Sequence, residues 1–180
     1  SNPPATRPFA TLTSEVNSAV AGSMAAIVAG PTAEDRPVRV VIPSIDLDTS
    51  IVEVGKNSKG EMDVPDGRTN LVGWYKDGTV PGFTGSAVLD AHVYAAFANL
   101  KYVPVAADIY VYTAGGKKLH FHVGDSRVFT LKELSPQVLF GESDAQRLNL
   151  ITCAGRYIPS LGTYEKRLVV FATLVATEQL

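Results

Sequence analysis

Residues 147–153 read Arg-Leu-Asn-Leu-Ile-Thr-Cys, an apolar-rich run that ends on the only cysteine of the chain. A second run covers residues 166–175, and apolar side chains dominate both of its alternating faces. Such a pattern is typical of a strand that is covered on two sides. Cys153 ends the first predicted strand and Arg167 lies at the start of the second. Both side chains can therefore reach a site that loops build at the rim of a rigid scaffold.

Six further β-rich runs precede this pair, and little helix is expected after residue 30. These runs are residues 38–42, 49–54, 86–91, 108–113, 117–123 and 127–131. Gly115-Gly116, between two alternating runs, is a hairpin signal. Short helical turns are expected at residues 95–102 and 135–140. The set predicts a mostly β protein, a closed or nearly closed barrel of eight strands with short crossover helices.

The N-terminal segment has a different pattern. Apolar residues recur there at spacings of three and four, which predicts an amphipathic helix over residues 9–29, and Gly30-Pro31 supplies its stop. We therefore expect an N-terminal extension at residues 1–30 and a barrel domain at residues 31–180. Because the stripe is only modestly apolar, the helix needs a surface to lie on. It could dock outside the barrel as a stalk, the favoured alternative, or cover a cleft as a lid.

Charge and hydropathy limit the classes of partner. The net charge is -2, the pI is about 5.9, and no block of Lys and Arg is present, which argues against a nucleic-acid-binding protein. The sequence has no run of about 18 apolar residues that could span a membrane. Its N-terminus also lacks a basic stretch ahead of an apolar core, as a secretory signal would have. Any membrane anchor is therefore expected in a segment outside this sequence.

Metal ligands are scarce in the sequence. A lone cysteine cannot form an internal disulfide, and metal sites usually need more sulfur or histidine close by. His120 and His122 flank Phe121 and share one face of a predicted strand, but no third ligand is visible nearby in the sequence. A solvated strand face is the favoured interpretation. Three acidic residues in one loop lack an EF-hand pattern: Glu61, Asp63 and Asp66. We therefore predict no metal and no cofactor.

Three motifs follow one another along the chain: Ala-Val-Leu-Asp-Ala-His at residues 87–92, Leu-Ile-Thr-Cys at 150–153 and Glu-Lys-Arg-Leu-Val-Val at 165–170. Smaller elements accompany them, namely Gly-Trp-Tyr at 73–75, Pro81-Gly82, Gly85, Phe97 and Leu100. From about residue 37 to 175 the ordered set resembles the sortases, most closely those often called class E or class F. The chain departs from the family pattern at Ala91 and Ala107, where sortases usually have glycine.

The resemblance implies a surface-anchored bacterial cysteine transpeptidase with Cys153 as nucleophile, His92 as acid/base and Arg167 as electrostatic partner. An imidazolium favours the thiolate and can then protonate a leaving amine. A guanidinium can stabilise an oxyanion or hold substrate carbonyls. Taken alone, Arg167 could instead be an ion-pair partner of Glu165, and His92 a half-buried structural histidine. The candidate substrate-binding residues are Thr152, Ala91, Trp74 and Tyr75.

The resemblance also implies a substrate and a place of action. The family cleaves a sorting motif of the LPXTG kind between Thr and Gly, and an amine acceptor from the cell wall or a pilin then resolves a thioester acyl-enzyme. The expected location is the extracellular face of the cell membrane. Two alternatives stay open: a cysteine endopeptidase that releases the acyl group to water, and a non-catalytic, sortase-like peptide-binding barrel. The presence of His92, Cys153 and Arg167 together disfavours the second.

Overall fold

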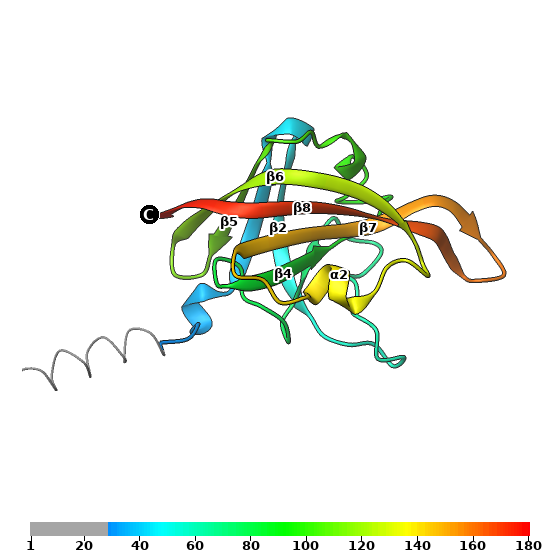
Figure 1. The fold of residues 1–180 in the computed structure, drawn as a ribbon, viewed down its shortest axis with the longest axis horizontal. Coiled ribbons are helices and arrows are strands. Elements are labelled where there is room, and N and C mark those ends of the chain that lie inside the picture. Colours follow the sequence, from blue (N-terminus) through cyan, green and yellow to red (C-terminus); the bar gives the residue numbers. More distant parts are fainter. Residues whose placement is uncertain (1–28) are drawn as a thin grey trace, which may run out of the picture. The chain divides into compact units, whose positions relative to one another are not determined.

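Eight strands close into a barrel in the computed structural model, which describes residues 29–180 (Figure 1). Around the barrel their order is β1-β2-β3-β4-β7-β8-β6-β5. Their bounds are β1 Pro37–Ile42, β2 Leu47–Val54, β3 Val72–Tyr75, β4 Gly85–Asp90, β5 Asp108–Thr113, β6 Lys117–Thr130, β7 Gln146–Ile158 and β8 Thr163–Gln179. The predicted closed, mostly β barrel is confirmed. The predicted N-terminal helix falls almost entirely outside the described residues, and the predicted domain boundary stays a prediction.

Two strands differ from the sequence-based prediction. β3 was not predicted, because four residues that include a glycine give too short a pattern. Residues 117–123 and 127–131 were expected as two strands, but β6 is one strand that continues through residues 124–126. Its register against β8 shifts between His120 and Phe121 and again between Val123 and Asp125. These bulges accommodate the turn-forming residues without ending the strand.

Short helical turns lie in the crossovers, where they were expected. A 3₁₀ turn covers Leu100–Tyr102, and helix α2 covers Pro136–Phe140. Two further 3₁₀ turns, Ala33–Asp35 and Pro43–Ile45, flank β1. The buried side-chain amide of Asn149 donates to the carbonyl of Leu139 at 2.8 Å and thereby holds α2 against β7.

The core has two parts, one on each side of the β7–β8 sheet. Large apolar side chains fill the barrel, among them Phe97, Phe121, Leu89, Leu100, Leu148 and Leu150. A smaller cluster, Val88, Leu139 and Val169, lies where α2 covers the outside of the sheet. Along β8, Leu168 and Val170 belong to the barrel core and Val169 belongs to the outer cluster. The predicted two-sided burial of this strand is therefore confirmed for its first half.

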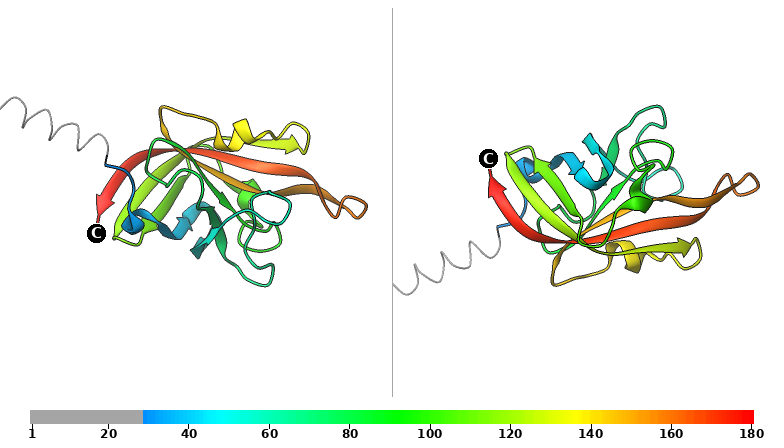
Figure 2. Two further views of the ribbon diagram at one scale, coloured as in Figure 1. Left: turned by 90° about the horizontal axis from the view of Figure 1, so that it is seen from below. Right: turned by 90° about the horizontal axis from the view of Figure 1, so that it is seen from above.

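Strand pairing brings the end of β4 beside the middle of β7 at one edge of the barrel. β4 pairs with β7 in parallel, with Asp90 opposite Ile151, so the residues that follow Asp90 lie beside Thr152 and Cys153. The prediction that Cys153 ends its strand is wrong, because β7 continues to Ile158 through its pairing with β8. β7 then pairs with β8 in antiparallel fashion. Figures 1 and 2 show the connection between β7 and β8 projecting beyond the neighbouring strands. This rim carries the candidate site.

Candidate active site

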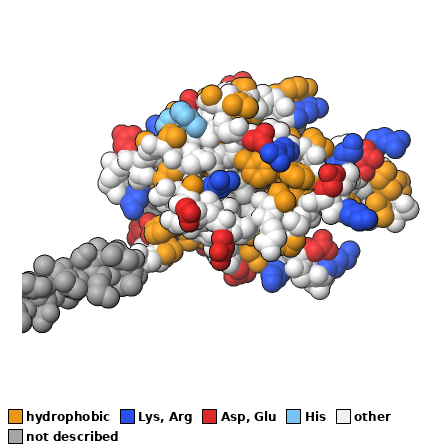
Figure 3. All heavy atoms as spheres, in the orientation of Figure 1, with side chains coloured by type: hydrophobic (Ala, Val, Ile, Leu, Met, Phe, Trp, Pro, Cys, Tyr) orange, Lys and Arg blue, Asp and Glu red, His pale blue; other side chains and the backbone are white. Residues whose placement is uncertain are grey.

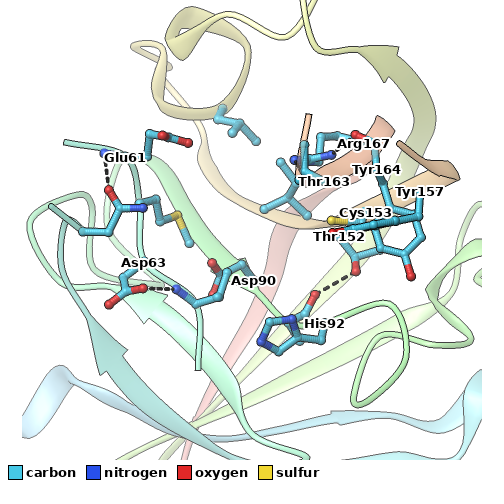
Figure 4. Close-up of a pocket in the computed structure, with 17 residues that line it drawn as sticks. Glu61, Asp63, Asp90, His92, Thr152, Cys153, Tyr157, Thr163, Tyr164 and Arg167 are labelled. Atoms are coloured by element: carbon cyan, nitrogen blue, oxygen red, sulfur yellow. Dashed lines mark hydrogen bonds between the residues drawn. The ribbon is translucent and has the colours of Figure 1, made fainter. Parts of the chain in front are cut away.

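A pocket of about 400 Å³ lies at the rim where β4 ends beside β7 and β8 (Figure 4). Its lining includes the thiol of Cys153, the imidazole of His92 and the guanidinium of Arg167. In Figure 4, Glu61 and Asp63, from the loop between β2 and β3, lie across the pocket from Cys153 and Arg167. The structure thus brings together the three residues that the sequence analysis singled out as catalytic candidates.

Cys153 and Arg167 occupy paired positions on neighbouring strands. Cys153 on β7 lies directly opposite Arg167 on β8 in the antiparallel register. Its thiol is free and half-buried. The Cα atoms of directly opposite residues on paired antiparallel strands lie about 4.5–5.5 Å apart. Strand pairing therefore fixes the distance between the Cα atoms of Cys153 and Arg167.

Hydrogen bonds to the chain hold the Arg167 guanidinium in place. Nη1 donates to the carbonyls of Lys166 at 2.8 Å and Tyr164 at 3.1 Å, and Nη2 donates to the hydroxyl of Thr163 at 3.0 Å. All three acceptors are neutral. Among residues 29–180, no carboxylate forms a salt bridge with this guanidinium. The positive charge is therefore available to a substrate.

Glu165, the alternative partner of Arg167, points to a different arginine. Its carboxylate accepts a hydrogen bond from the backbone amide of Arg156 at 3.1 Å and lies 3.9 Å from the Nε of Arg156. The interpretation of Arg167 as a surface ion-pair partner of Glu165 is therefore wrong in this structure.

His92 is oriented from two sides. Its Nε2 lies 2.8 Å from the carbonyl oxygen of Pro65. Because a carbonyl only accepts, Nε2 must carry a proton, which leaves the Nδ1 lone pair of the neutral ring free. The ring also stacks on Tyr94, with centroids 4.9 Å apart and planes 19° apart. The loop before β3 and the turn after β4 together define the position of the imidazole.

Thr152 and Ala91 join β7, which carries Cys153, to the end of β4, which His92 follows. The Thr152 hydroxyl donates to the carbonyl of Ala91 at 2.7 Å, and this hydrogen bond is buried. The amide of Ala91 in turn donates to the carbonyl of Ile151 at 3.4 Å. Thr152 and Ala91 are two of the four predicted substrate-binding residues, and both line the pocket. Their hydrogen bonds also fix the position of β4 relative to β7.

Residues 40–175 match the protein-family model described as the sortase domain. This match covers most of the chain, including His92, Cys153 and Arg167. The chain belongs to the sortase family.

Solved sortase structures share its fold. Sortase A from Listeria monocytogenes is 21% identical, with a TM-score of 0.59 over 79% of this chain and 89% of that one. Sortase A from Corynebacterium diphtheriae is 24% identical, with a TM-score of 0.59 over 78% and 62%. A sortase D5 transpeptidase from Clostridium perfringens is 18% identical, with a TM-score of 0.60 over 78% and 79%. A search of curated protein sequences finds no match.

Sortases are cell-surface enzymes. Within residues 29–180 of this sortase, we find no helix with the length and apolar character that crossing a membrane requires.

Trp74 and Tyr75 do not line the cysteine pocket of this sortase. Trp74 is only 5% exposed, and its indole Nε1 donates to the carbonyl of Thr79 at 3.1 Å. Tyr75 packs against Phe140 with ring centroids 5.2 Å apart and lines a separate pocket beside α2. The structure therefore places the first in the core and the second at α2, apart from Cys153.

Asp90 is a pocket residue that the sequence analysis missed. Its carboxyl group is buried, and its Oδ1 has no hydrogen-bond partner in the described structure. Burial, with a smaller contribution from the charge of Asp63, raises the pKa of Asp90 to about 8. The group is therefore a neutral acid at pH 7 and a potential hydrogen-bond donor. The feature that could have identified Asp90 in the sequence is an acidic residue within the apolar run that precedes His92.

Proposed function

We propose that this sortase is a cysteine transpeptidase in which Cys153 is the nucleophile, His92 the general acid and base, and Arg167 the electrostatic partner. The observation that carries the proposal is the register pairing of Cys153 with Arg167 beside His92 in one pocket. A thiol, an imidazole and an unneutralised guanidinium can supply the nucleophile, the proton transfer and the oxyanion stabilisation that acyl transfer needs.

The acylation step uses each of these groups once. The Cys153 thiolate attacks the carbonyl carbon of the scissile peptide bond and forms a C–S bond, and the carbonyl oxygen becomes an oxyanion. The Arg167 guanidinium, held by neutral acceptors, donates to this oxyanion or to neighbouring substrate carbonyls. As the C–N bond breaks, the His92 imidazolium gives its proton to the leaving amine. The products are a thioester acyl-enzyme and the free C-terminal fragment.

The second step reverses these roles. An acceptor amine attacks the thioester carbonyl, neutral His92 accepts a proton from that amine, and the C–S bond breaks to regenerate the Cys153 thiolate. The product is a new amide bond. We expect the substrate to be a sorting signal of the LPXTG kind, cleaved between Thr and Gly, and the acceptor to be an amine of the cell wall or of a pilin. We also propose that this sortase belongs to class E or class F.

The place of action is proposed on the same grounds. A sorting enzyme must meet its substrates after they leave the cytoplasm, so we propose that the barrel works at the extracellular face of the cell membrane. The N-terminal extension at residues 1–30 would link the barrel domain to an anchoring segment.

The test is a peptide library built on LPXTG, with each position varied, incubated with the enzyme and analysed by intact-protein mass. We expect a mass increase that corresponds to the acyl fragment N-terminal to the cleaved bond, and none with Cys153→Ala. Added amine acceptor should convert the adduct into a ligated peptide. Arg156→Lys, an exposed substitution on the same hairpin, serves as the matched control and should behave as the parent.

The same experiment separates the alternatives. Cleavage with release to water, unchanged by any amine, would replace the transpeptidase by an endopeptidase. Saturable peptide binding with no adduct and no cleavage across the library would indicate a binding barrel. Turnover by the Cys153→Ala variant would overturn the assignment of the nucleophile.

A further inference from the structure

Two histidines and an aspartate lie together on the outside of the barrel, on β5 and β6. Asp108 begins β5 and lies directly opposite His122 on β6, and His120 lies opposite Tyr110. The spacing of two residues puts both imidazoles on one face of β6, while Leu119, Phe121 and Val123 are buried in the core. Figure 3 shows histidine side chains exposed side by side, close to where Figure 1 labels β6. None of the three lines the cysteine pocket.

The ring nitrogens of both histidines converge on one carboxylate oxygen. The distance from His120 Nε2 to Asp108 Oδ1 is 2.7 Å, and that from His122 Nε2 to the same oxygen is 3.0 Å. The two rings stand nearly perpendicular, at 84°, with centroids 4.9 Å apart. One ligand atom from each residue therefore lies within 4.8 Å of the other two. The sequence analysis missed the third group because Asp108 comes from the neighbouring strand.

These separations are close to those around a bound metal ion. Zinc binds nitrogen and carboxylate oxygen at about 2.0–2.2 Å, so neighbouring ligand atoms lie about 2.8–3.1 Å apart in an octahedral site and about 3.3–3.6 Å apart in a tetrahedral one. The two nitrogen–oxygen distances already approach these ranges. To hold an ion, the imidazoles would rotate and lose the Nε2 protons that now face Asp108, so zinc binding should release protons.

The surroundings suit an ion with an open coordination shell. The side chains of Asp108, His120 and His122 are 45%, 26% and 48% exposed, so water can enter and occupy the positions that the protein leaves free. His120 also stacks on Tyr110, with centroids 4.6 Å apart, which orients its ring. The hydrogen bond from His120 lowers the pKa of the Asp108 carboxyl, so this group is ionised at neutral pH.

We propose that Asp108, His120 and His122 form a binding site for one divalent transition-metal ion, with zinc as the representative ion and water completing its shell. Two imidazoles and one carboxylate favour zinc, cobalt, nickel or copper over calcium and magnesium, which prefer oxygen ligands throughout. Because its ligands come from β5 and β6, the ion would crosslink these strands. An ion that binds the folded barrel raises the temperature of unfolding.

The test is calorimetric titration of tag-free Cys153→Ala protein, in which the competing thiol is removed, with zinc chloride and separately with calcium chloride. We expect one equivalent of zinc to bind, a rise in Tm with zinc, and no response to calcium. Asp108→Asn should weaken zinc binding by at least about tenfold, and the double variant His120→Ala/His122→Ala should abolish both binding and the Tm rise.

Two matched controls complete the design. His92→Ala removes the third histidine of the chain, and Asp48→Asn removes an exposed carboxylate on β2 that pairs with Arg39. Each, in the Cys153→Ala background, should bind zinc as the parent does. Zinc binding that survives the double histidine variant, or that is absent from the parent, overturns the proposal. Since the background is catalytically inactive by design, this outcome is independent of the proposed transpeptidase activity.

Discussion

Cys153 and Arg167 are direct partners in the antiparallel register of β7 and β8. Arg167 follows Cys153 by fourteen positions in the sequence, and the pairing of β7 with β8 sets the distance between their backbones. Three hydrogen bonds to the neutral acceptors of Thr163, Tyr164 and Lys166 then fix the guanidinium. The charge is both positioned and unneutralised, which is what an oxyanion partner needs.

Replacing Arg167 by lysine keeps the charge and removes the planar fork that reaches three acceptors at once. We expect Arg167→Lys to lower the single-turnover rate of acyl-enzyme formation by roughly two to three orders of magnitude. Arg156→Lys, at a side chain that is 84% exposed, should leave the rate unchanged. Near-parental rates for Arg167→Lys would remove Arg167 from the reacting centre.

Tyr94 supports the ring of His92 by stacking while its own side chain is largely exposed. Tyr94→Phe keeps the ring and should retain the parental kcat. Tyr94→Ala removes the stacking surface, so the imidazole is held only by the Pro65 carbonyl, and we expect kcat to fall by about tenfold. Steady-state kinetics on a cleaved peptide distinguish the two variants. Equal loss in both would assign the effect to the hydroxyl instead.

The hydroxyl of Thr152 on β7 makes a buried hydrogen bond to the residue that follows β4 and so links the two strands. Thr152→Val keeps the shape and leaves the Ala91 carbonyl without that donor, so the free energy of unfolding should fall by about 1–3 kcal/mol. Thr152→Ser keeps the donor and should lose less. Urea denaturation, with m-values checked for two-state behaviour, measures both. A valine variant as stable as the parent would contradict the link.

The carboxyl of Asp90 makes stability depend on pH. Burial raises its folded-state pKa from 3.8 to about 8, so between pH 4 and 8 the native protein holds a proton that the unfolded chain releases. Its contribution to the free energy of unfolding is therefore fully present below about pH 4 and decreases as the pH rises to 8. Asp90→Asn, which mimics the neutral carboxyl, should remove this dependence of stability on pH. At pH 8 its free energy of unfolding should exceed that of the parent by a few kcal/mol, order of magnitude.

The control for this pH effect is Asp144→Asn, which changes an exposed carboxylate in the loop before β7. Its difference from the parent should be flat across the same pH range. Denaturation midpoints at half-unit pH steps provide the measurement. If Asp90→Asn and Asp144→Asn show the same pH dependence, the buried carboxyl is not the cause.

Motifs within single strands were predictable from the sequence. The two-faced apolar pattern of residues 166–175 identified β8, and the motifs around His92, Cys153 and Arg167 identified one rim, although β7 extends beyond Cys153 and β8 begins before Arg167. The pairing and register of the strands were not predictable, because the periodicity of one strand does not determine which residues of another strand lie opposite it. Asp108 meets His120 and His122 only through the β5–β6 register. Trp74, whose motif suggested a substrate groove, is buried because β3 lies between β2 and β4.

The two sides of the pocket differ in the sequence separation of the residues that form them. Cys153 and Arg167 need only one local hairpin, whereas the parallel pairing of β4 with β7 brings Ala91 to Thr152 across 61 residues. Local pairings form early in folding and distant ones form late, because long loops are costly to close. During refolding of the complete chain we therefore expect Cys153 to meet Arg167 before it meets His92. The proposed catalytic site would then be complete only once the barrel has closed, and pulse-labelled hydrogen exchange during refolding that protects β8 before β4 would show this order.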